Sequence, residues 1–465
     1  MDRRTFMAGS ATATAGALAV FGSATSSSAE AAGGTGSGGD HVRSVTAVTQ
    51  VFGDGQKLVA VAVEYDSDSD SDIDGSTLST STFTVADRTV TKVYANRTAD
   101  LAQRGRDGRY VIVELSPDDT AAALWVTRQG SGTPPADGSG SGSGDSGGGA
   151  GAGGPVVGDT TPGGTIVAAK ATLTQSGTVT TTRGTRYAAD GTARTTDAVV
   201  NLIVDDFRQL SFSDPVTGQT LRYNLFVPKN HDRRKSYPMV LFMHDASVVN
   251  VATEGPLVQG LGAVCWASPE DQARHESFVL APEYGSVVID DSYEPSTLFE
   301  ATANLVRSVT EEYGIDPNRL YTTGQSMGAM MSLGLNIRYP ELFAAAFIVA
   351  GQWPASQAAP LAEKKLWILV SADDTKAYPG EQAITEVIRD QGTEVSTALW
   401  DGRSTAAEFA ADVRSMKAQR TPVNFAAFEA GTVVPAGSTT SAHMATWQVA
   451  YTIPGIRDWI MRQSR

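Results

Sequence analysis

Alternating apolar and polar positions dominate the N-terminal part of the chain and predict a region built from β-strands. The segments with this pattern are residues 42–51, 58–64, 89–94, 110–115, 165–173, 177–182 and 198–204. Helical spacing does not interrupt them, and several short strands without helices are typical of a β-sandwich. We therefore predict an all-β sandwich over residues 40–205.

A tract rich in glycine, serine and proline, residues 129–164, interrupts this strand pattern. Such composition is typical of linkers. Neither half of the strand-rich region has enough strands to bury a core alone, so we interpret the tract as an insertion within one sandwich. The tract contains Gly144-Asp-Ser146-Gly-Gly148. This string has no predicted strand before it and no helix after it, so we interpret Ser146 as linker.

From about residue 206 the pattern changes to uniformly apolar strands that alternate with helices. The predicted strands are residues 221–227, 237–243, 278–282, 320–323, 344–350, 366–370 and 395–400. Residues 296–313 carry apolar side chains at helical spacing. Apolar strands that alternate with helices indicate a mostly parallel sheet covered on both faces. Residues 206–465 are therefore predicted to form an α/β domain.

The predicted strand at residues 320–323 runs into Gly324-Gln-Ser326-Met-Gly328 and then into a helical pattern. G-x-S-x-G between a strand and a helix is a nucleophile elbow, which lifts the serine hydroxyl out of the sheet. Glycines are expected on both sides of Ser326 because larger side chains would strike the neighbouring backbone. The amide of Met327 would point at an oxyanion formed over the serine. The alternative is a glycine-rich turn of a Rossmann-like unit.

A nucleophilic serine needs a base and an acid that orients the base. In this fold class the order along the chain is nucleophile, acid, base. Of the five histidines, only His443 follows both the elbow and the later strands, and the alternative for it is a surface histidine at a helix start. The acid should follow the strand at residues 366–370, where Asp373 and Asp374 are the candidates. We favour Asp374 and expect the other aspartate to cap a turn.

A second oxyanion donor should come from the loop after residues 237–243, where the backbone amides of Asp245 or Ala246 would serve. The Asp245 side chain must point away, because its charge would oppose an oxyanion. Side chains near these segments could line a substrate pocket, although buried aromatic side chains more often belong to a core. The pocket candidates are Trp266, Tyr284, Gln325, Trp353 and Tyr378.

Composition narrows the class of protein. The 465 residues carry a formal net charge of −15, which argues against nucleic-acid binding. The single cysteine, Cys265, excludes an intramolecular disulfide, and its apolar neighbours predict a buried, inert thiol. After the N-terminus, we find no apolar stretch long enough to span a membrane. The predicted chemistry requires no cofactor and no metal.

The N-terminus has the pattern of a targeting segment. Arg3-Arg4 precedes a weakly apolar stretch, and residues 1–32 resemble a twin-arginine export signal. An ordinary secretory signal is the alternative. Both predict a secreted, cell-surface or periplasmic protein, and neither includes this segment in the fold.

An acidic run at residues 66–75 raises the question of calcium. Asp70, Asp72, Asp74 and Gly75 match the start of an EF-hand loop. The twelfth position is Ser81 instead of glutamate, and the pattern predicts no flanking helices. We favour a solvated acidic loop over a calcium site.

Several of these stretches carry a family resemblance. Residues 206–465 resemble the α/β-hydrolase carboxylesterases that carry an N-terminal immunoglobulin-like domain, relatives of polyhydroxybutyrate depolymerases and feruloyl esterases. The shared stretches are Phe242-Met-His-Asp-Ala-Ser, Gly262-Ala-Val-Cys-Trp-Ala-Ser-Pro-Glu, Phe278-Val-Leu-Ala-Pro-Glu, Gly314-Ile-Asp-Pro-Asn-Arg-Leu-Tyr-Thr-Thr-Gly-Gln-Ser-Met-Gly, Asp374-Thr-Lys-Ala-Tyr-Pro-Gly and His443-Met-Ala-Thr-Trp. The Gly/Ser tract and the Asp-Ser run depart from the family pattern.

The resemblance implies a catalytic triad of Ser326, Asp374 and His443. It also favours Asp374 over Asp373, because the acid of the family precedes the Lys-Ala-Tyr-Pro segment. For the first domain it implies an immunoglobulin-like fold.

The predicted protein is an exported serine esterase that hydrolyses carboxylic esters through an acyl-enzyme. One alternative is a serine peptidase of the prolyl-oligopeptidase type, which shares the fold and triad order but usually carries a large gating domain. The other is a binding or adhesion protein with an inert hydrolase domain, against which the intact elbow, acid and base argue. The expected partner is an ester substrate. A second expected partner is another copy of the chain, bound through the N-terminal sandwich in a homo-oligomer.

Overall fold

The computed structural model describes residues 41–66, 71–127 and 154–465. The predicted export signal, Asp70 and Ser146 lie outside these described residues. In the described part, strands before and after the Gly/Ser tract share sheets, and a second, α/β domain follows.

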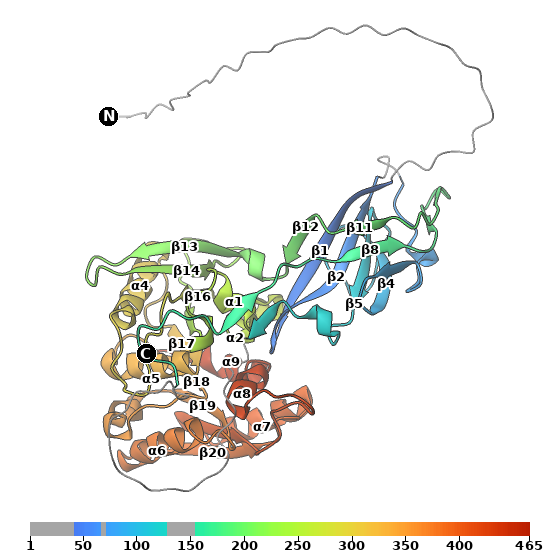
Figure 1. The fold of residues 1–465 in the computed structure, drawn as a ribbon. Helices are drawn as coiled ribbons and strands as arrows, with labels where there is room; N and C mark the ends of the chain where they lie inside the picture. The colour runs from blue at the N-terminus through green and yellow to red at the C-terminus, as the bar shows by residue number, and fades with distance from the viewer. Residues whose placement is uncertain (1–40, 67–70, 128–153) are drawn as a thin grey trace, which may run out of the picture. The chain divides into compact units, whose positions relative to one another are not determined.

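A five-stranded sheet forms the larger half of the β-rich domain (Figure 1). Strands β1 (Val42–Phe52) and β2 (Gly55–Tyr65) make a long antiparallel hairpin. Strands β5 (Tyr110–Leu115) and β4 (Val90–Asn96) continue the sheet beside β2. Strand β12 (Ala198–Asn201) pairs in parallel with β1 on the other side. This strand comes from beyond the tract, so the sheet is complete only with sequence from both sides.

A second, three-stranded sheet packs its apolar side chains against the first. Its strands, in spatial order, are β11 (Ala193–Thr195), β8 (Thr172–Gln175) and β3 (Phe83–Val85). The side chains of Val61, Val113, Phe83 and Leu173 are buried in one cluster from both sheets. Two short ribbons complete the domain: β9 (Val179–Thr180) with β10 (Arg186–Tyr187), and β6 (Trp125–Thr127) with β7 (Gly164–Ile166). The predicted all-β class is confirmed.

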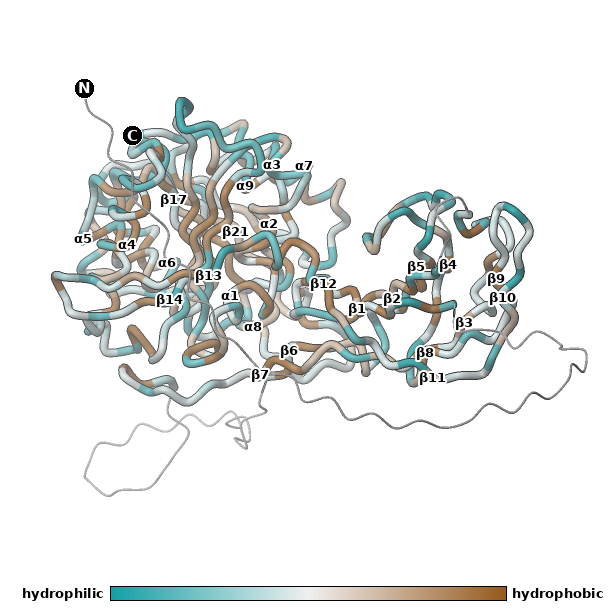
Figure 2. Tube along the Cα trace, turned by 90° about the horizontal axis from the view of Figure 1, so that it is seen from above, coloured by the Kyte–Doolittle hydropathy of each residue, from teal (hydrophilic) through white to brown (hydrophobic). Residues whose placement is uncertain are grey.

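The α/β domain is built on a nine-stranded sheet of order β13-β14-β16-β15-β17-β18-β19-β21-β20. The strands are β13 (Phe207–Ser213), β14 (Thr220–Phe226), β15 (Met239–Met243), β16 (Phe278–Glu283), β17 (Leu320–Gln325), β18 (Ala345–Val349), β19 (Leu366–Ser371), β20 (Val395–Trp400) and β21 (Val423–Phe428). All pairings from β16 to β20 are parallel, and β13 and β14 are antiparallel. The inner strands are buried on both faces, which explains their continuous apolar runs and the brown band through β17 in Figure 2.

Helices cover both faces of this sheet, as predicted. One face carries α4 (Leu298–Tyr313), α5 (Met327–Arg338) and α6 (Ala377–Asp390) (Figures 1 and 2). The other face carries α2 (Leu261–Ala267), α7 (Ala406–Ala418), α8 (Ala442–Ala450) and α9 (Pro454–Ile460). Two further short helices are α1 (Gly255–Val258) and α3 (Pro269–Arg274).

Contacts join the β-rich domain to the α/β domain, and residues 40–465 belong to one compact unit. Val51 and Trp125 are buried in the same apolar cluster as the core of the α/β domain. The turn between β1 and β2 meets α8 closely: a Cβ atom on Gly53 would lie 2.2 Å from the carbonyl oxygen of Gln448. Glycine is therefore the residue that this approach allows.

The structure also describes the single cysteine and part of the acidic run. Cys265 is buried in α2, and burial raises the pKa of its thiol to about 12. In the acidic run, the Asp74 carboxylate accepts a hydrogen bond from the Ser76 amide and caps a short 3₁₀ turn. Among the described residues, there is no group of three or more His, Cys, Asp and Glu side chains placed to hold a metal.

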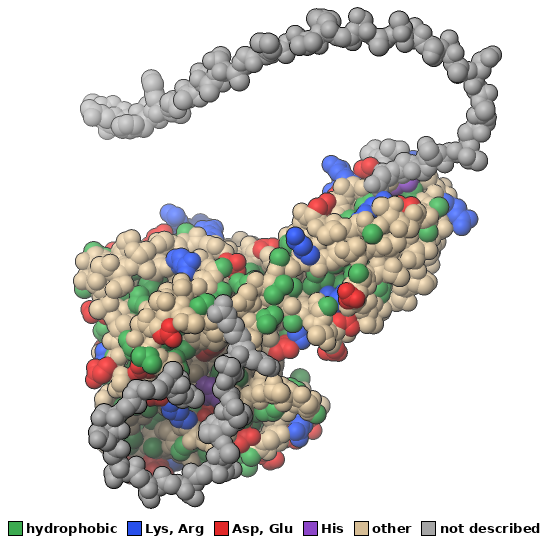
Figure 3. Space-filling model, in the orientation of Figure 1, with side chains coloured by type: hydrophobic (Ala, Val, Ile, Leu, Met, Phe, Trp, Pro, Cys, Tyr) green, Lys and Arg blue, Asp and Glu red, His purple; other side chains and the backbone are tan. Residues whose placement is uncertain are grey.

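Acidic and basic side chains are interspersed over the face seen in Figure 3, which shows no continuous basic patch. Within the described ranges, each helix is too short or too polar to cross a membrane.

Candidate active site

The turn after β17 holds Ser326 in a conformation that few side chains adopt. Its φ of 51° and ψ of −118° are strained for a residue other than glycine, and helix α5 begins at the next residue. A Cβ atom on Gly328 would lie 1.9 Å from the carbonyl oxygen of Met243, and one on Gly324 would lie 2.4 Å from the carbonyl carbon of Gly328. The two glycines thus let α5 pack tightly against the sheet, with Ser326 presented at the carboxyl end of β17.

Three side chains from distant parts of the chain form one line of hydrogen bonds. Nε2 of His443 lies 2.9 Å from Oγ of Ser326, and Nδ1 of His443 lies 2.5 Å from Oδ2 of Asp374. His443 stands in the first turn of α8, where the Ser441 hydroxyl accepts a hydrogen bond from the Met444 amide. Such a line is the geometry in which an imidazole can take the proton of a serine hydroxyl.

Asp374 is held as a carboxylate in the loop after β19. Its Oδ1 accepts hydrogen bonds from the amides of Ala377 and Lys376, at 2.9 and 3.1 Å, while Oδ2 faces His443. Burial alone would raise its pKa, but the His443 hydrogen bond and charge and the two amides outweigh burial, so the pKa lies below the usual value. The group is therefore ionised and oriented by its own loop.

The neighbouring Asp373 has different partners. Its Oδ1 accepts a hydrogen bond from the Ser371 hydroxyl at 2.5 Å, and its Oδ2 accepts one from the Gly431 amide at 2.8 Å. These contacts tie two loops together and do not involve His443. The structure therefore brings Asp374, and not Asp373, to the imidazole.

The loop after β15 lies beside the elbow and shapes a site for an oxyanion. The Asp245 carboxylate accepts hydrogen bonds from the Ser247 amide at 2.8 Å and from Nε2 of Gln325 at 2.9 Å. Its charge is thus engaged within the loop, as the sequence requires. Among the described residues, the recorded hydrogen bonds use neither the Met327 amide nor the Ala246 amide, so both could donate to an oxyanion.

His244, in the same loop, is a neutral structural residue. The Tyr284 amide donates to its Nε2 at 3.1 Å, which places the ring proton on Nδ1, where it is donated to the Asp245 carbonyl at 2.7 Å. Complete burial lowers its pKa to about 4. His244 therefore does not compete with His443 for a role as base.

Ser326, Asp374 and His443 open into a cavity of about 290 Å³. The surface of its remaining walls is mostly apolar, with charged and polar groups at Asp290, Asp291, Gln352, Thr375 and Lys376. The lining residues are Pro155, Ile289, Asp290, Asp291, Met327, Met330, Ala350, Gln352, Thr375 and Lys376.

The pocket candidates from the sequence do not line this cavity. Trp266, Tyr284 and Trp353 are buried in the core, and Tyr378 stacks on Phe425. Gln325 is buried beneath the loop after β15, where it bonds Asp245. The actual lining comes from four loops and from α5. The spacing of Met327 and Met330 along α5 is the one sequence signal that could have placed lining residues beside Ser326.

A buried carboxyl group lies behind the cavity. Glu381 on α6 is fully buried, and its Oε1 accepts a hydrogen bond from the Gly351 amide at 2.8 Å. Its other oxygen has no hydrogen-bond partner among the described residues. Burial, with the nearby charge of Asp374, raises the pKa of Glu381 well above its usual value. Its carboxyl group holds the chain next to Ala350, at the cavity wall.

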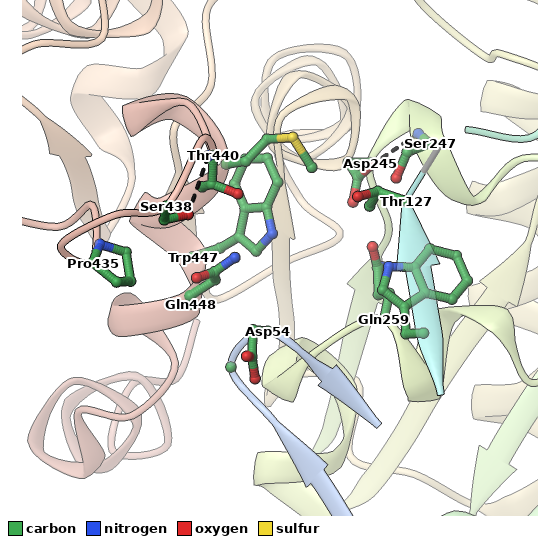
Figure 4. Close-up of a pocket in the computed structure, with 13 residues that line it drawn as sticks. Asp54, Thr127, Asp245, Ser247, Gln259, Pro435, Ser438, Thr440, Trp447 and Gln448 are labelled. Atoms are coloured by element: carbon green, nitrogen blue, oxygen red, sulfur yellow. Dashed lines mark hydrogen bonds between the residues drawn. The ribbon is translucent and has the colours of Figure 1, made fainter. Parts of the chain in front are cut away.

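A second cavity, of about 350 Å³, is lined by side chains of α8, of the loop after β15 and of the turn between β1 and β2. In Figure 4, Trp447 and Gln448 of α8 face Gln259 and Asp245 across it, with Asp54 below. The ring of Trp447 meets the His443 ring edge-on, with centroids 5.2 Å apart. This cavity is lined mainly by polar side chains and contains none of the three aligned side chains.

A nine-stranded α/β sheet with a serine elbow, and histidine and aspartate from later loops, defines an α/β-hydrolase. Residues 44–188 match the family described as the esterase Ig-like N-terminal domain, and residues 215–433 match the family described as putative esterase. The chain thus combines an esterase Ig-like N-terminal domain with a putative esterase domain.

Individual relatives are similar over shorter or longer stretches. Over 49 residues the chain is 47% identical to acetylxylan esterase A of Aspergillus ficuum. This match covers 10% of this chain and 16% of that protein. Over 177 residues it is 30% identical to poly(3-hydroxyalkanoate) depolymerase C of Paucimonas lemoignei. This match covers 36% of this chain and 40% of that protein. The chain thus spans less than half the length of the curated relatives it matches.

Among solved structures, the crystal structure of a thermostable esterase superposes on this chain with a TM-score of 0.72 at 26% sequence identity. The superposition covers 91% of this chain and 100% of that one. The two-domain arrangement therefore recurs in a solved esterase.

Proposed function

We propose that this chain is a serine esterase that hydrolyses carboxylic esters through an acyl-enzyme. The observation that carries the proposal is the line of hydrogen bonds from Ser326 through His443 to Asp374 at a cavity. The esterase families matched by both domains, and the thermostable esterase that superposes on most of the chain, support the same reaction class.

In the proposed first half-reaction, Oγ of Ser326 bonds to the ester carbonyl carbon while Nε2 of His443 takes the hydroxyl proton. The amides of Met327 and Ala246 receive the oxyanion, and the Asp374 carboxylate stabilises the imidazolium. Collapse of the tetrahedral intermediate breaks the bond to the alcohol oxygen. The alcohol leaves with the proton from His443, and the acyl group stays on Ser326.

In the second half-reaction, His443 takes a proton from water, and the water oxygen bonds to the acyl carbon. The second tetrahedral intermediate expels Oγ of Ser326, which recovers its proton from His443. The carboxylic acid is released and the enzyme is restored. The serine proton leaves with the alcohol and a proton from water replaces it, so the three side chains end in their starting state and only the ester and water are consumed.

Covalent labelling tests this proposal directly. A fluorophosphonate probe should label the wild-type chain, and Ser326→Ala should abolish both labelling and turnover of p-nitrophenyl acetate. Ser146→Ala, in the Gly/Ser tract, should behave as wild type. If Ser326→Ala hydrolysed the ester at the wild-type rate, the proposal would be wrong. Comparison of matched ester and peptide anilide substrates separates an esterase from the peptidase alternative.

We also propose that the protein is exported by the twin-arginine route to the periplasm, cell surface or medium. The support is the Arg3-Arg4 pair ahead of a weakly apolar stretch. Replacement of both arginines by lysine should retain the enzyme inside the producing cell, as measured by the ester activity of the separated fractions. Unchanged distribution would exclude this route.

A further inference from the structure

A strap of ten residues, 154–163, crosses from the β-rich domain onto the α/β domain. It ends at β7, which pairs with β6. Backbone groups of the strap make hydrogen bonds to loops that follow β15 and β16. These bonds join Val157 N to Asp290 Oδ2 (2.8 Å), Gly158 N to Val287 O (3.0 Å), Asp159 O to Val287 N (2.8 Å), Thr160 O to Asn250 Nδ2 (3.0 Å) and Gly163 N to Ser247 O (2.9 Å).

These contacts fix the path of the strap. The reciprocal pair at Val287 has the form of a short ladder, and bonds lie on both sides of it along the strap. The loops after β15 and β16 lie at the carboxyl ends of the parallel strands, where Ser326 also stands. The strap is therefore anchored along the rim of the candidate active site.

At its first residues the strap reaches the cavity itself. Pro155 lines the cavity together with Ser326 and His443. A proline has no amide proton and a fixed φ, so it can form a wall without leaving a donor unpaired. Asp291, which lines the same cavity, is also fixed in place: its carboxylate accepts a hydrogen bond from Nε2 of Gln352 at 2.6 Å and pairs with the Lys376 ammonium.

Apolar walls of this cavity are contributed by Ile289, Met327, Met330 and Ala350. A volume of about 290 Å³ is at the small end for a ligand pocket. An acyl group bonded to Oγ of Ser326 must occupy space next to that oxygen, and apolar walls favour a short hydrocarbon chain there. The polar second cavity does not include Ser326 and offers no such space.

We propose that the strap forms the outer wall of the acyl pocket and that Pro155 determines how long an acyl chain the enzyme accepts. A segment encoded with the N-terminal domain would then complete the substrate site of the α/β domain. This inference rests on the proposed ester hydrolysis.

The test compares kcat/KM for p-nitrophenyl acetate, butyrate and octanoate. Pro155→Gly should raise the octanoate-to-acetate ratio by about fivefold or more, and Pro155→Trp should lower it by a similar factor, as expected when a pocket gains or loses space for methylenes. The matched controls are Val156→Gly and Val156→Trp, because the Val156 side chain is 62% exposed and does not line the cavity. Thermal melts of all four variants check that the fold is intact.

Two results would overturn the strap proposal: an unchanged octanoate-to-acetate ratio in both Pro155 variants, or an equal change of that ratio in the Val156 controls. Each leaves the esterase function standing, provided that wild type turns over esters and Ser326→Ala does not. Absence of ester turnover in the wild-type chain would instead remove the proposed function. If Pro155→Trp fails to fold, Pro155→Gly still decides the question.

Discussion

Two adjacent aspartates show how local geometry divides roles that the sequence leaves together. Both follow β19, but Asp374 faces the imidazole and Asp373 ties two loops. An acid that orients the base and stabilises the imidazolium matters most in the transition state. The same substitution at Asp374 and at Asp373 therefore tests which of the two aspartates is the acid.

We predict that Asp374→Asn lowers kcat for p-nitrophenyl acetate by about three to four orders of magnitude, because it removes the charge beside His443. Asp373→Asn should stay within about tenfold of wild type, since it affects only the position of a loop. His443→Ala should be almost inactive. If Asp373→Asn were the crippled variant, the assignment of the acid would be reversed.

Glu381 gives a prediction about pH. Because burial raises its pKa, the folded chain binds a proton here under conditions in which the unfolded chain has released it. The stability from this group is complete below the unfolded pKa and is lost as pH rises through the folded pKa. Glu381→Gln keeps the acceptor for the Gly351 amide and has no charge to bury. Its melting temperature, relative to wild type, should rise as the pH increases above the usual pKa of a glutamate in an unfolded chain, about 4.3.

Glu386→Gln is the control for that measurement, because Glu386 is exposed on the same helix. The difference in melting temperature between Glu386→Gln and wild type should not change with pH in this way. A Glu381→Gln variant that became less stable as pH rose would show that the buried group is ionised in the folded state.

At the scale of elements, the position of Ser326 depends on how closely α5 approaches β15. Gly328→Ala should destabilise the chain by more than about 3 kcal/mol, because the new Cβ would overlap the Met243 carbonyl and the surrounding backbone is packed. Gly285→Ala is the control, since a Cβ atom there would meet no other atom within 4 Å. Urea unfolding measures both, and equal midpoints would contradict the proposed close packing.

The elements that the sequence predicts well are those with one strong pattern. Strands such as β15 and β19 are apolar throughout, because both faces are covered by helices. In the α/β domain two strands were missed: β13 is an edge strand with mostly exposed side chains, and β21 contains a buried asparagine, Asn424, that breaks the apolar run. In the β-rich domain the missed strands are only two or three residues long, too short to show an alternating pattern: β3, β6, β10 and β11. Turn chemistry and order along the chain single out Ser326 and His443, whose side chains lie within hydrogen-bonding distance in the structure.

The lining of the cavity could not be predicted in the same way. It combines Pro155, Ile289 and Met330, which come from three separate segments of the chain and meet only through the fold. The aromatic candidates fill the core, where their large apolar area is most stabilising. A pocket is a property of several loop ends at once, so no single stretch of sequence marks it.

At the scale of the whole molecule, strands from both sides of the Gly/Ser tract depend on each other. Strand β1 pairs with β12, β3 with β8, and β6 with β7. A fragment of residues 41–127 should therefore lack a cooperative thermal transition, because its sheets lose these partners. Deletion of residues 138–152 from the full chain should leave the melting temperature nearly unchanged, since loop closure depends weakly on loop length. A folded fragment would mean that the tract separates two domains.

The burial of Cys265 has a practical consequence. With a pKa of about 12, its thiol supplies almost no thiolate near neutral pH, and the side chain is closed off from reagents in solution. The sequence has no other cysteine. Val156→Cys would thus place the single reactive thiol of the protein on the strap, one residue from the cavity wall. A fluorophore attached there could report, during turnover, whether the rim of the pocket moves when an acyl chain enters.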